Sequence, residues 1–156
     1  MTLKQNIIKK LTETESTLST AESLTGGGVA SDIVDTPGAS KVFKGGMVCY
    51  FLEVKEIELN IPKEILGGDA VNEETAILMA KNISKKLNTT YGIATTGIAT
   101  SYDERAPMAY TSIYDSVNDK SYNYLFNFDR SNSRESVRNK VSKLLLKKLW
   151  DVIKDS

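Results

Sequence analysis

The chain is organised around one stretch, Thr20-Ala21-Glu22-Ser23-Leu24-Thr25-Gly26-Gly27-Gly28. It follows a short run that favours a β-strand, residues 17–21, and it leads into residues 29–34, which favour a helix. When a strand ends and a helix begins within a few residues, several backbone N–H groups are left without partners. Such groups bind a negative charge, and the glycines let a ligand approach the backbone closely. The stretch therefore predicts an anion-binding turn between a strand and a helix.

Ser23 lies just before these N–H groups, and two interpretations of it stay open on this stretch alone. In the first, its hydroxyl is a nucleophile beside a pocket for an oxyanion or a phosphate. In the second, Ser23 caps the following helix and the glycines only permit a tight turn. The choice between them depends on the rest of the chain.

Helical and strand patterns alternate around this turn. The longer helical segments carry an apolar stripe at helical spacing, and we expect helices at residues 2–15, 29–34, 53–59, 72–87 and 133–152. We expect strands at residues 17–21 and 91–95 and a buried strand at residues 42–51, with a bulge or close approach at Gly45-Gly46. Residues 110–114 and 122–128 predict a hairpin whose second strand alternates aromatic residues on one buried face, and residues 100–107 predict a polar loop.

This order of elements predicts the class of fold. Helices alternate with strands over the first two-thirds of the chain, and a hairpin and a helix close it. The pattern indicates an α/β protein, a three-layer α/β/α domain with a mixed, mostly parallel sheet. No repeat, linker or low-complexity segment interrupts it, so we expect a single domain over residues 1–156.

The composition excludes several classes of partner. Twenty basic residues balance twenty acidic ones, so nothing indicates a surface for nucleic acid or for an anionic membrane. No apolar run is long enough to span a bilayer, and the N-terminus lacks the apolar segment of a signal peptide. The single cysteine, Cys49, cannot form an internal disulfide. We therefore expect a cytoplasmic protein.

The chain contains no histidine. This absence excludes a Ser-His-Asp triad, a Cys-His pair and histidine-based zinc sites. If the protein hydrolyses a substrate, its general base must be a lysine, tyrosine, aspartate or glutamate.

Four segments carry a family resemblance when they are taken in order. They are Thr20 to Gly27 (T-A-E-S-x-T-G-G), Gly45 to Lys55 (G-G-x-V-x-Y-x-x-E-x-K), Ala70 to Glu74 (A-V-[ST]-x-E) and Thr96 to Ala99 (T-G-I-A). Together they resemble the CinA C-terminal-domain family, whose characterised members are nicotinamide-nucleotide amidases of the PncC type. The order and spacing cover roughly residues 1–100 well and the remainder more loosely. The first two motifs are specific only as a pair.

The resemblance implies a serine-type amidohydrolase of the same three-layer fold. Such an enzyme cuts the carboxamide of nicotinamide mononucleotide, a small-molecule substrate, to give nicotinate mononucleotide and ammonia without a metal or cofactor. By position, Ser23 is the nucleophile, Lys55 its general base and Tyr50 an assisting group. The residues that the resemblance implies for substrate binding are Thr25, Gly26, Gly27, Thr96, Gly97 and Arg130.

Each of these residues, taken alone, also has a structural interpretation. Lys55 alone is more often a solvated helix lysine, Tyr50 a core residue and Thr96-Gly97 a turn at a strand end. Arg130 could equally pair with Asp129 or Glu135 on the surface. Chemistry supports the joint interpretation, because a serine without histidine needs a base and a lysine desolvated in a cleft can supply it.

The chain departs from the family pattern in three places. Leu52 stands where the family has asparagine, the glycine-rich T-G-I-A-G-P-G-G loop becomes Thr96 to Arg105, and K-P-V-G-T becomes Ala106 to Tyr110. Because Ser23, Tyr50 and Lys55 are present while the loop differs, we interpret the departures as a change in substrate recognition and not in the chemistry. Two alternatives stay open: a non-catalytic nucleotide-binding or regulatory module, and an amidase for another small carboxamide. A homodimer is also left open.

Overall fold

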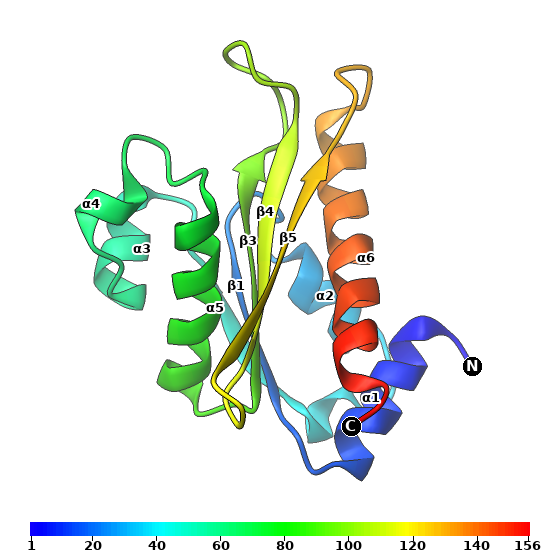
Figure 1. Cartoon of the computed structure of the whole chain (residues 1–156). Coiled ribbons are helices and arrows are strands. Elements are labelled where there is room, and N and C mark those ends of the chain that lie inside the picture. Colours follow the sequence, from blue (N-terminus) through cyan, green and yellow to red (C-terminus); the bar gives the residue numbers. More distant parts are fainter.

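Five strands form one sheet in the order β2-β1-β3-β4-β5 (Figure 1). The structure, a computed structural model, describes all residues from Met1 to Ser156. The strands are β1 (Leu18–Glu22), β2 (Phe43–Val48), β3 (Tyr91–Ile98), β4 (Met108–Asp115) and β5 (Lys120–Asn127). The helices are α1 (Leu3–Glu13), α2 (Gly28–Val34), α3 (Leu52–Leu59), α4 (Lys63–Leu66), α5 (Glu73–Leu87) and α6 (Arg134–Ile153), with a 3-10 turn at Ala39–Lys41.

The sheet is mixed, as the sequence predicts. β1 pairs in parallel with β2 and β3, whereas β4 pairs antiparallel with β3 and β5. Four of the five strands therefore run in one direction and only β4 opposes them. The predicted hairpin is β4 and β5, joined by the turn before Lys120.

Helices cover both faces of the sheet, which gives three layers (Figure 1). On one face, α1, α2 and α6 bury a core with side chains such as Leu11, Val29 and Leu145. On the other, α3, α4 and α5 bury a second core with Leu59, Leu66 and Met79. The two cores confirm the predicted α/β/α arrangement, because each face of the sheet buries its own apolar surface.

The helices start where their capping residues predict. Thr2 forms both bonds of a capping box: the Gln5 amide donates to Thr2 Oγ1 at 3.2 Å and the Thr2 amide donates to Gln5 Oε1 at 2.8 Å. At the start of α5, the Thr75 amide donates to the Asn72 side chain at 2.8 Å. The short helix α4 was not predicted.

The predicted buried strand over residues 42–51 is wrong in its burial and its length. β2 ends at Val48 and lies at the edge of the sheet, so its residues alternate between half-buried and exposed. Tyr50 and Phe51 are 54% and 71% exposed, because the chain leaves the sheet there to begin α3. The aromatic residues of β5 are likewise half-buried rather than buried, since β5 is the other edge strand.

Gly46 is the predicted point of close approach. A Cβ atom at this position would lie 1.9 Å from Thr20 Oγ1 and 2.6 Å from the carbonyl oxygen of the same residue. Glycine therefore lets β2 lie against β1 at this point. The approach matters for the site, because the ends of these two strands lead to Ser23 and to Lys55.

None of the helices combines the length and the apolar character that a membrane crossing requires.

Candidate active site

Ser23 directly follows β1 at the carboxyl end of the parallel strands. β1 lies between β2 and β3, where the order of the strands reverses, and such a position is a common place for ligand sites in α/β sheets. The Ser23 amide donates to the Thr95 carbonyl of β3 at 3.0 Å. This bond fixes the serine across the gap between two strand ends.

Lys55 of α3 reaches the same point from the other side of β1. Its side chain is 1% exposed, and its Nζ donates to Ser23 Oγ at 2.9 Å. The same Nζ donates to the carbonyl oxygens of Cys49 at 2.6 Å and Tyr50 at 3.0 Å. Lys55 is therefore not a solvated helix lysine, and the structure brings it into direct contact with Ser23.

The environment of Lys55 favours its neutral form. Burial lowers the pKa of the Lys55 ammonium to about 8, and nearby Cys49 opposes this shift. No ion pair joins Lys55 to a carboxylate. A buried amine without a counter-ion holds its proton weakly, so a substantial fraction is neutral near pH 8.

The N-terminus of α2 is occupied by a carboxylate of the chain itself. The amides of Val29 and Ala30 donate to Glu22 at 2.8 and 3.0 Å, and Thr25 Oγ1 donates to Glu22 at 2.5 Å. The N-cap residue is Gly27, and no side chain caps the helix there. The interpretation of Ser23 as the helix cap is therefore wrong, and Glu22 takes the place predicted for a bound anion.

Some amides of the turn remain without partners. The backbone N–H groups of Leu24, Thr25 and Gly27 make no hydrogen bond within the protein, whereas the Gly26 amide donates to the Ser23 carbonyl at 3.1 Å. Gly26 and Gly27 both have positive φ angles, 57° and 97°, which glycine adopts without strain. The turn thus offers amide donors next to the Ser23 hydroxyl.

A cavity of about 190 Å³ opens beside Ser23. Among the predicted site residues, Ser23, Tyr50 and Gly97 line it. The other lining residues are Leu24, Asp69, Val71, Ile98, Ala99, Thr100, Tyr102 and Arg134. Tyr50 is therefore a cavity residue and not a core residue.

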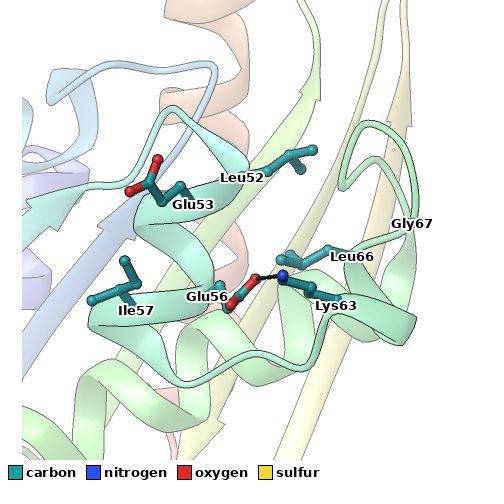
Figure 2. Close-up of a pocket in the computed structure, with 7 residues that line it drawn as sticks. All are labelled: Leu52, Glu53, Glu56, Ile57, Lys63, Leu66 and Gly67. Carbon is teal, nitrogen blue, oxygen red and sulfur yellow. Dashed lines mark ion pairs between the residues drawn. The ribbon is translucent and has the colours of Figure 1, made fainter.

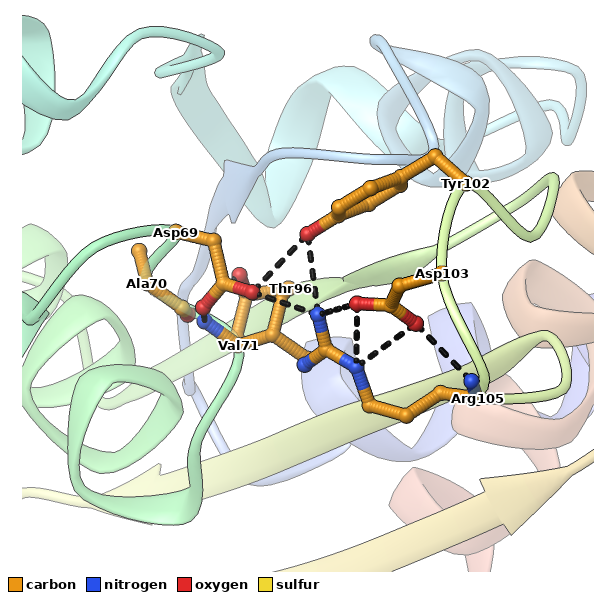
Figure 3. Close-up of polar contacts among 7 residues, drawn as sticks. All are labelled: Asp69, Ala70, Val71, Thr96, Tyr102, Asp103 and Arg105. Atoms are coloured by element: carbon orange, nitrogen blue, oxygen red, sulfur yellow. Dashed lines mark hydrogen bonds and ion pairs between the residues drawn. The ribbon is translucent and has the colours of Figure 1, made fainter.

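Five of the six predicted substrate-binding residues lie outside this lining: Thr25, Gly26, Gly27, Thr96 and Arg130. Thr25 Oγ1 is taken by Glu22 and by Thr95, 2.8 Å away. Thr96 is 1% exposed, and its hydroxyl donates to the Ala70 carbonyl at 2.8 Å (Figure 3). It therefore holds the segment that contains the lining residues Asp69 and Val71 without lining the cavity itself. Arg130 is exposed and donates to the Glu104 carbonyl, not to Asp129 or Glu135.

Arg134 lines the cavity where Arg130 was expected to face the substrate. It is the first residue of α6, and it donates to Tyr50 Oη at 2.7 Å and to Thr100 Oγ1 at 3.3 Å. A cation in the first turn of a helix opposes the helix dipole. This unfavourable position for a cation is the one feature of the sequence that could have indicated a role for Arg134.

A larger hollow, of about 570 Å³, lies between α3 and α4 (Figure 2). It holds the pair Lys63–Glu56, 4.0 Å apart, and apolar side chains such as Ile57 and Leu66. No serine, cysteine or threonine lines it. Size alone would favour this hollow, but the chemistry of its side chains does not.

Comparison with known proteins agrees with the fold and the motifs. The sequence model described as the CinA C-terminal domain matches residues 1–153. The chain belongs to the CinA C-terminal domain family. A CinA-like protein of Dictyoglomus turgidum is 45% identical over 98 residues, which is 62% of this chain and 24% of that protein. A putative competence-damage inducible protein of Bacillus mycoides is 34% identical over 155 residues, 96% of this chain and 38% of that protein.

Solved structures of the CinA family share the architecture. The competence/damage inducible protein CihA of Agrobacterium tumefaciens superposes with a TM-score of 0.86 at 25% identity and covers 94% of this chain and 91% of its own. A CinA superfamily protein of Enterobacter cloacae superposes with a TM-score of 0.89 at 24% identity, covering 97% and 90%. The chain spans between about a quarter and two-fifths of the length of the curated relatives named above.

Proposed function

We propose that this CinA-family chain is a serine-type amidohydrolase and that its substrate is the carboxamide of nicotinamide mononucleotide. The observation that carries the proposal is the contact of 2.9 Å between Lys55 Nζ and Ser23 Oγ, with the lysine buried and free of any carboxylate. Serine is a weak nucleophile unless a base takes its proton, and a desolvated lysine can do so near neutral pH.

The reaction runs in two steps. Neutral Lys55 takes the proton of Ser23 Oγ as that oxygen attacks the carboxamide carbon, and in this proposal the oxyanion is stabilised by the amides of Leu24, Thr25 and Gly27, which have no partner within the protein. The C–N bond then breaks, and the Lys55 ammonium returns the proton to the leaving ammonia. Water, activated by the same lysine, cleaves the acyl ester and releases the carboxylate and Ser23.

Arg134 is the group that would hold the phosphate of the nucleotide. Its guanidinium lines the cavity and forms no ion pair with a carboxylate, so its charge is available to an anion. Tyr50 Oη accepts from Arg134 at 2.7 Å. In this proposal Tyr50 assists by orienting the arginine, while its own backbone carbonyl accepts from Lys55 at 3.0 Å.

The direct test is ammonia release. Purified protein is incubated with nicotinamide mononucleotide, and free ammonia is measured over time at pH 8 to 9. We expect one ammonia for each nicotinate mononucleotide formed. Binding of the nucleotide without ammonia would contradict the proposal and favour a regulatory nucleotide-binding module. Turnover of simpler carboxamides only would favour an amidase for another substrate.

The glycine-poor loop at residues 100–107 is expected to affect substrate binding more than chemistry. Thr100 and Tyr102 of this loop line the cavity, whereas Ser23 and Lys55 belong to other segments. Replacing residues 100–103 by Gly-Pro-Gly-Gly should therefore change KM severalfold and change kcat less. Steady-state kinetics measure both. If neither parameter moves, the loop is only a surface connection.

A further inference from the structure

Asp69 and Tyr102 form one wall of the Ser23 cavity, and both are held in place. The Asp69 carboxylate accepts from the Val71 amide at 3.0 Å, from Tyr102 Oη at 2.9 Å and from Arg105 Nη2 at 2.8 Å (Figure 3). These bonds join the segment before α5 to the loop at residues 100–107. The wall is therefore built by two segments that are distant in the sequence.

The cluster behind this wall keeps a negative charge. Arg105 lies between two carboxylates, with Nη2 at 2.6 Å from Asp103 and 2.8 Å from Asp69 (Figure 3). Asp69, Asp103 and Arg105 together carry one net negative charge, and the further cation Arg130 acts on Asp103 rather than on Asp69. Burial raises the pKa of Asp69, but the hydrogen bonds from Arg105, Val71 and Tyr102 outweigh it and keep that pKa below its usual value. Asp69 is thus ionised wherever the lysine base can work.

The residue that follows Asp69 has a strained backbone conformation. Ala70 is fully buried and has a φ of 59°, a conformation that residues other than glycine rarely adopt. Its carbonyl accepts from Thr96 Oγ1 at 2.8 Å. Such strain persists only where surrounding contacts hold it, and it is often found where a side chain must be positioned. Here the strained residue directly follows Asp69, whose carboxylate is held by Val71, Tyr102 and Arg105.

A positive charge lies on another part of the cavity wall. Arg134 is the only basic residue and Asp69 the only acidic residue of the lining. They come from different elements, and neither forms an ion pair with the other. The cavity therefore presents one negative and one positive group to its contents.

We propose that Asp69, held by Arg105 and Tyr102, makes the Ser23 cavity select substrates whose carboxamide is carried on a positively charged ring. The inference rests on the proposed function and adds to it the residue, Asp69, that distinguishes a charged ring from a neutral one. A pyridinium ring gains attraction from the net negative wall, while a neutral ring of the same shape does not. Arg134 serves the anionic end of the same molecule.

The test compares two ligands that differ in ring charge alone or nearly so. They are nicotinamide mononucleotide and its 1,4-dihydro form, whose ring is uncharged. Both are titrated by calorimetry into the Ser23→Ala protein, so that neither is consumed. We expect the charged form to bind at least tenfold more tightly. Adding Asp69→Asn should weaken the charged form about tenfold and change the neutral form less than twofold.

Two further variants make the test decisive. Glu56→Gln removes a carboxylate that also pairs with a cation but lies outside the cavity, so the ratio of the two dissociation constants should stay unchanged. Arg105→Gln removes the cation that offsets the charge of Asp69, so it should raise the dissociation constant of the neutral form relative to that of the charged form. This ratio does not depend on the fraction of protein that is folded. The proposal is overturned if Asp69→Asn weakens the binding of both ligands equally, or if neither ligand binds. It is also overturned if Glu56→Gln weakens the binding of the charged form as much as Asp69→Asn does. Selective binding by a protein that releases no ammonia would overturn the amidase and leave the charge selection standing.

Discussion

Ser23→Ala is expected to lower kcat for ammonia release from nicotinamide mononucleotide by about a thousandfold or more. The hydroxyl is the one nucleophile that contacts Lys55, and no neighbouring group can take its place in the covalent step. The fold should stay intact, because Ser23 is not the cap of α2 and its backbone bond to Thr95 does not need the side chain. Steady-state kinetics and circular dichroism on the same preparations measure both effects.

Ser19→Ala is the matched control. Ser19 lies on β1, the strand that Ser23 directly follows, and is also buried, but its hydroxyl bonds to Thr89 Oγ1 at 2.7 Å and does not line the cavity. We expect near-normal kcat in this variant. Near-normal turnover in Ser23→Ala itself would end the serine-amidase proposal. A comparable loss in both variants would point to a general effect on β1 instead.

The sequence predicts the order and type of the elements well because their signals are local. Caps such as Thr2 and Asn72 and the apolar stripes of α1, α5 and α6 act within a few residues. Burial at the sheet edges was not predictable in the same way. Whether β2 and β5 have a neighbour on one side or on both depends on the whole topology, and an edge strand can carry as many apolar residues as a central one.

In the site too, the identity of residues was predictable from local motifs, whereas their contacts depend on the whole fold. Motif resemblance named Ser23 and Lys55, but they meet because Gly46 allows β2 to lie close to β1 and the chain then turns into α3. The pattern could not show that Glu22 fills the N-terminus of α2, since a strand residue was not expected to reach over the turn. Nor could it show that Arg134, four positions after Arg130, enters the cavity.

Lys55→Met is expected to abolish ammonia release. Methionine fills a similar volume but cannot take the proton from Ser23 Oγ, 2.9 Å from the lysine nitrogen. Lys55→Arg should also be inactive, because the guanidinium stays protonated at any working pH. Together the two variants separate a base from a fixed positive charge. Full activity in Lys55→Met would contradict the assignment, and activity in Lys55→Arg would show that charge alone is needed.

The pH dependence of the wild-type enzyme identifies the same residue. Only neutral Lys55 can act as the base, so kcat/KM should fall as the pH drops below about 8, the pKa to which burial lowers the lysine. No histidine is present to produce such a limb. Burial raises the pKa of the Cys49 thiol above its usual value, away from this range. Cys49→Ala should therefore keep the limb, and a limb that vanishes with Cys49 would contradict the assignment to Lys55.

Stability gives an independent measurement of the same pKa. In the unfolded chain Lys55 titrates near 10.5, and in the folded protein near 8, so between these values the unfolded state binds more protons. The contribution of Lys55 to the stability of the wild type should then rise with pH from about 8 to about 10.5, by roughly 3 kcal/mol at 1.4 kcal/mol per pKa unit. Lys55→Met lacks this rise, while every other titrating group is shared. The difference in unfolding free energy between the two proteins, measured by urea titration at pH 7 and at pH 10.5, should shift by that amount in favour of the wild type. An unchanged difference would mean that Lys55 titrates normally in the folded protein, and it could not then serve as the base.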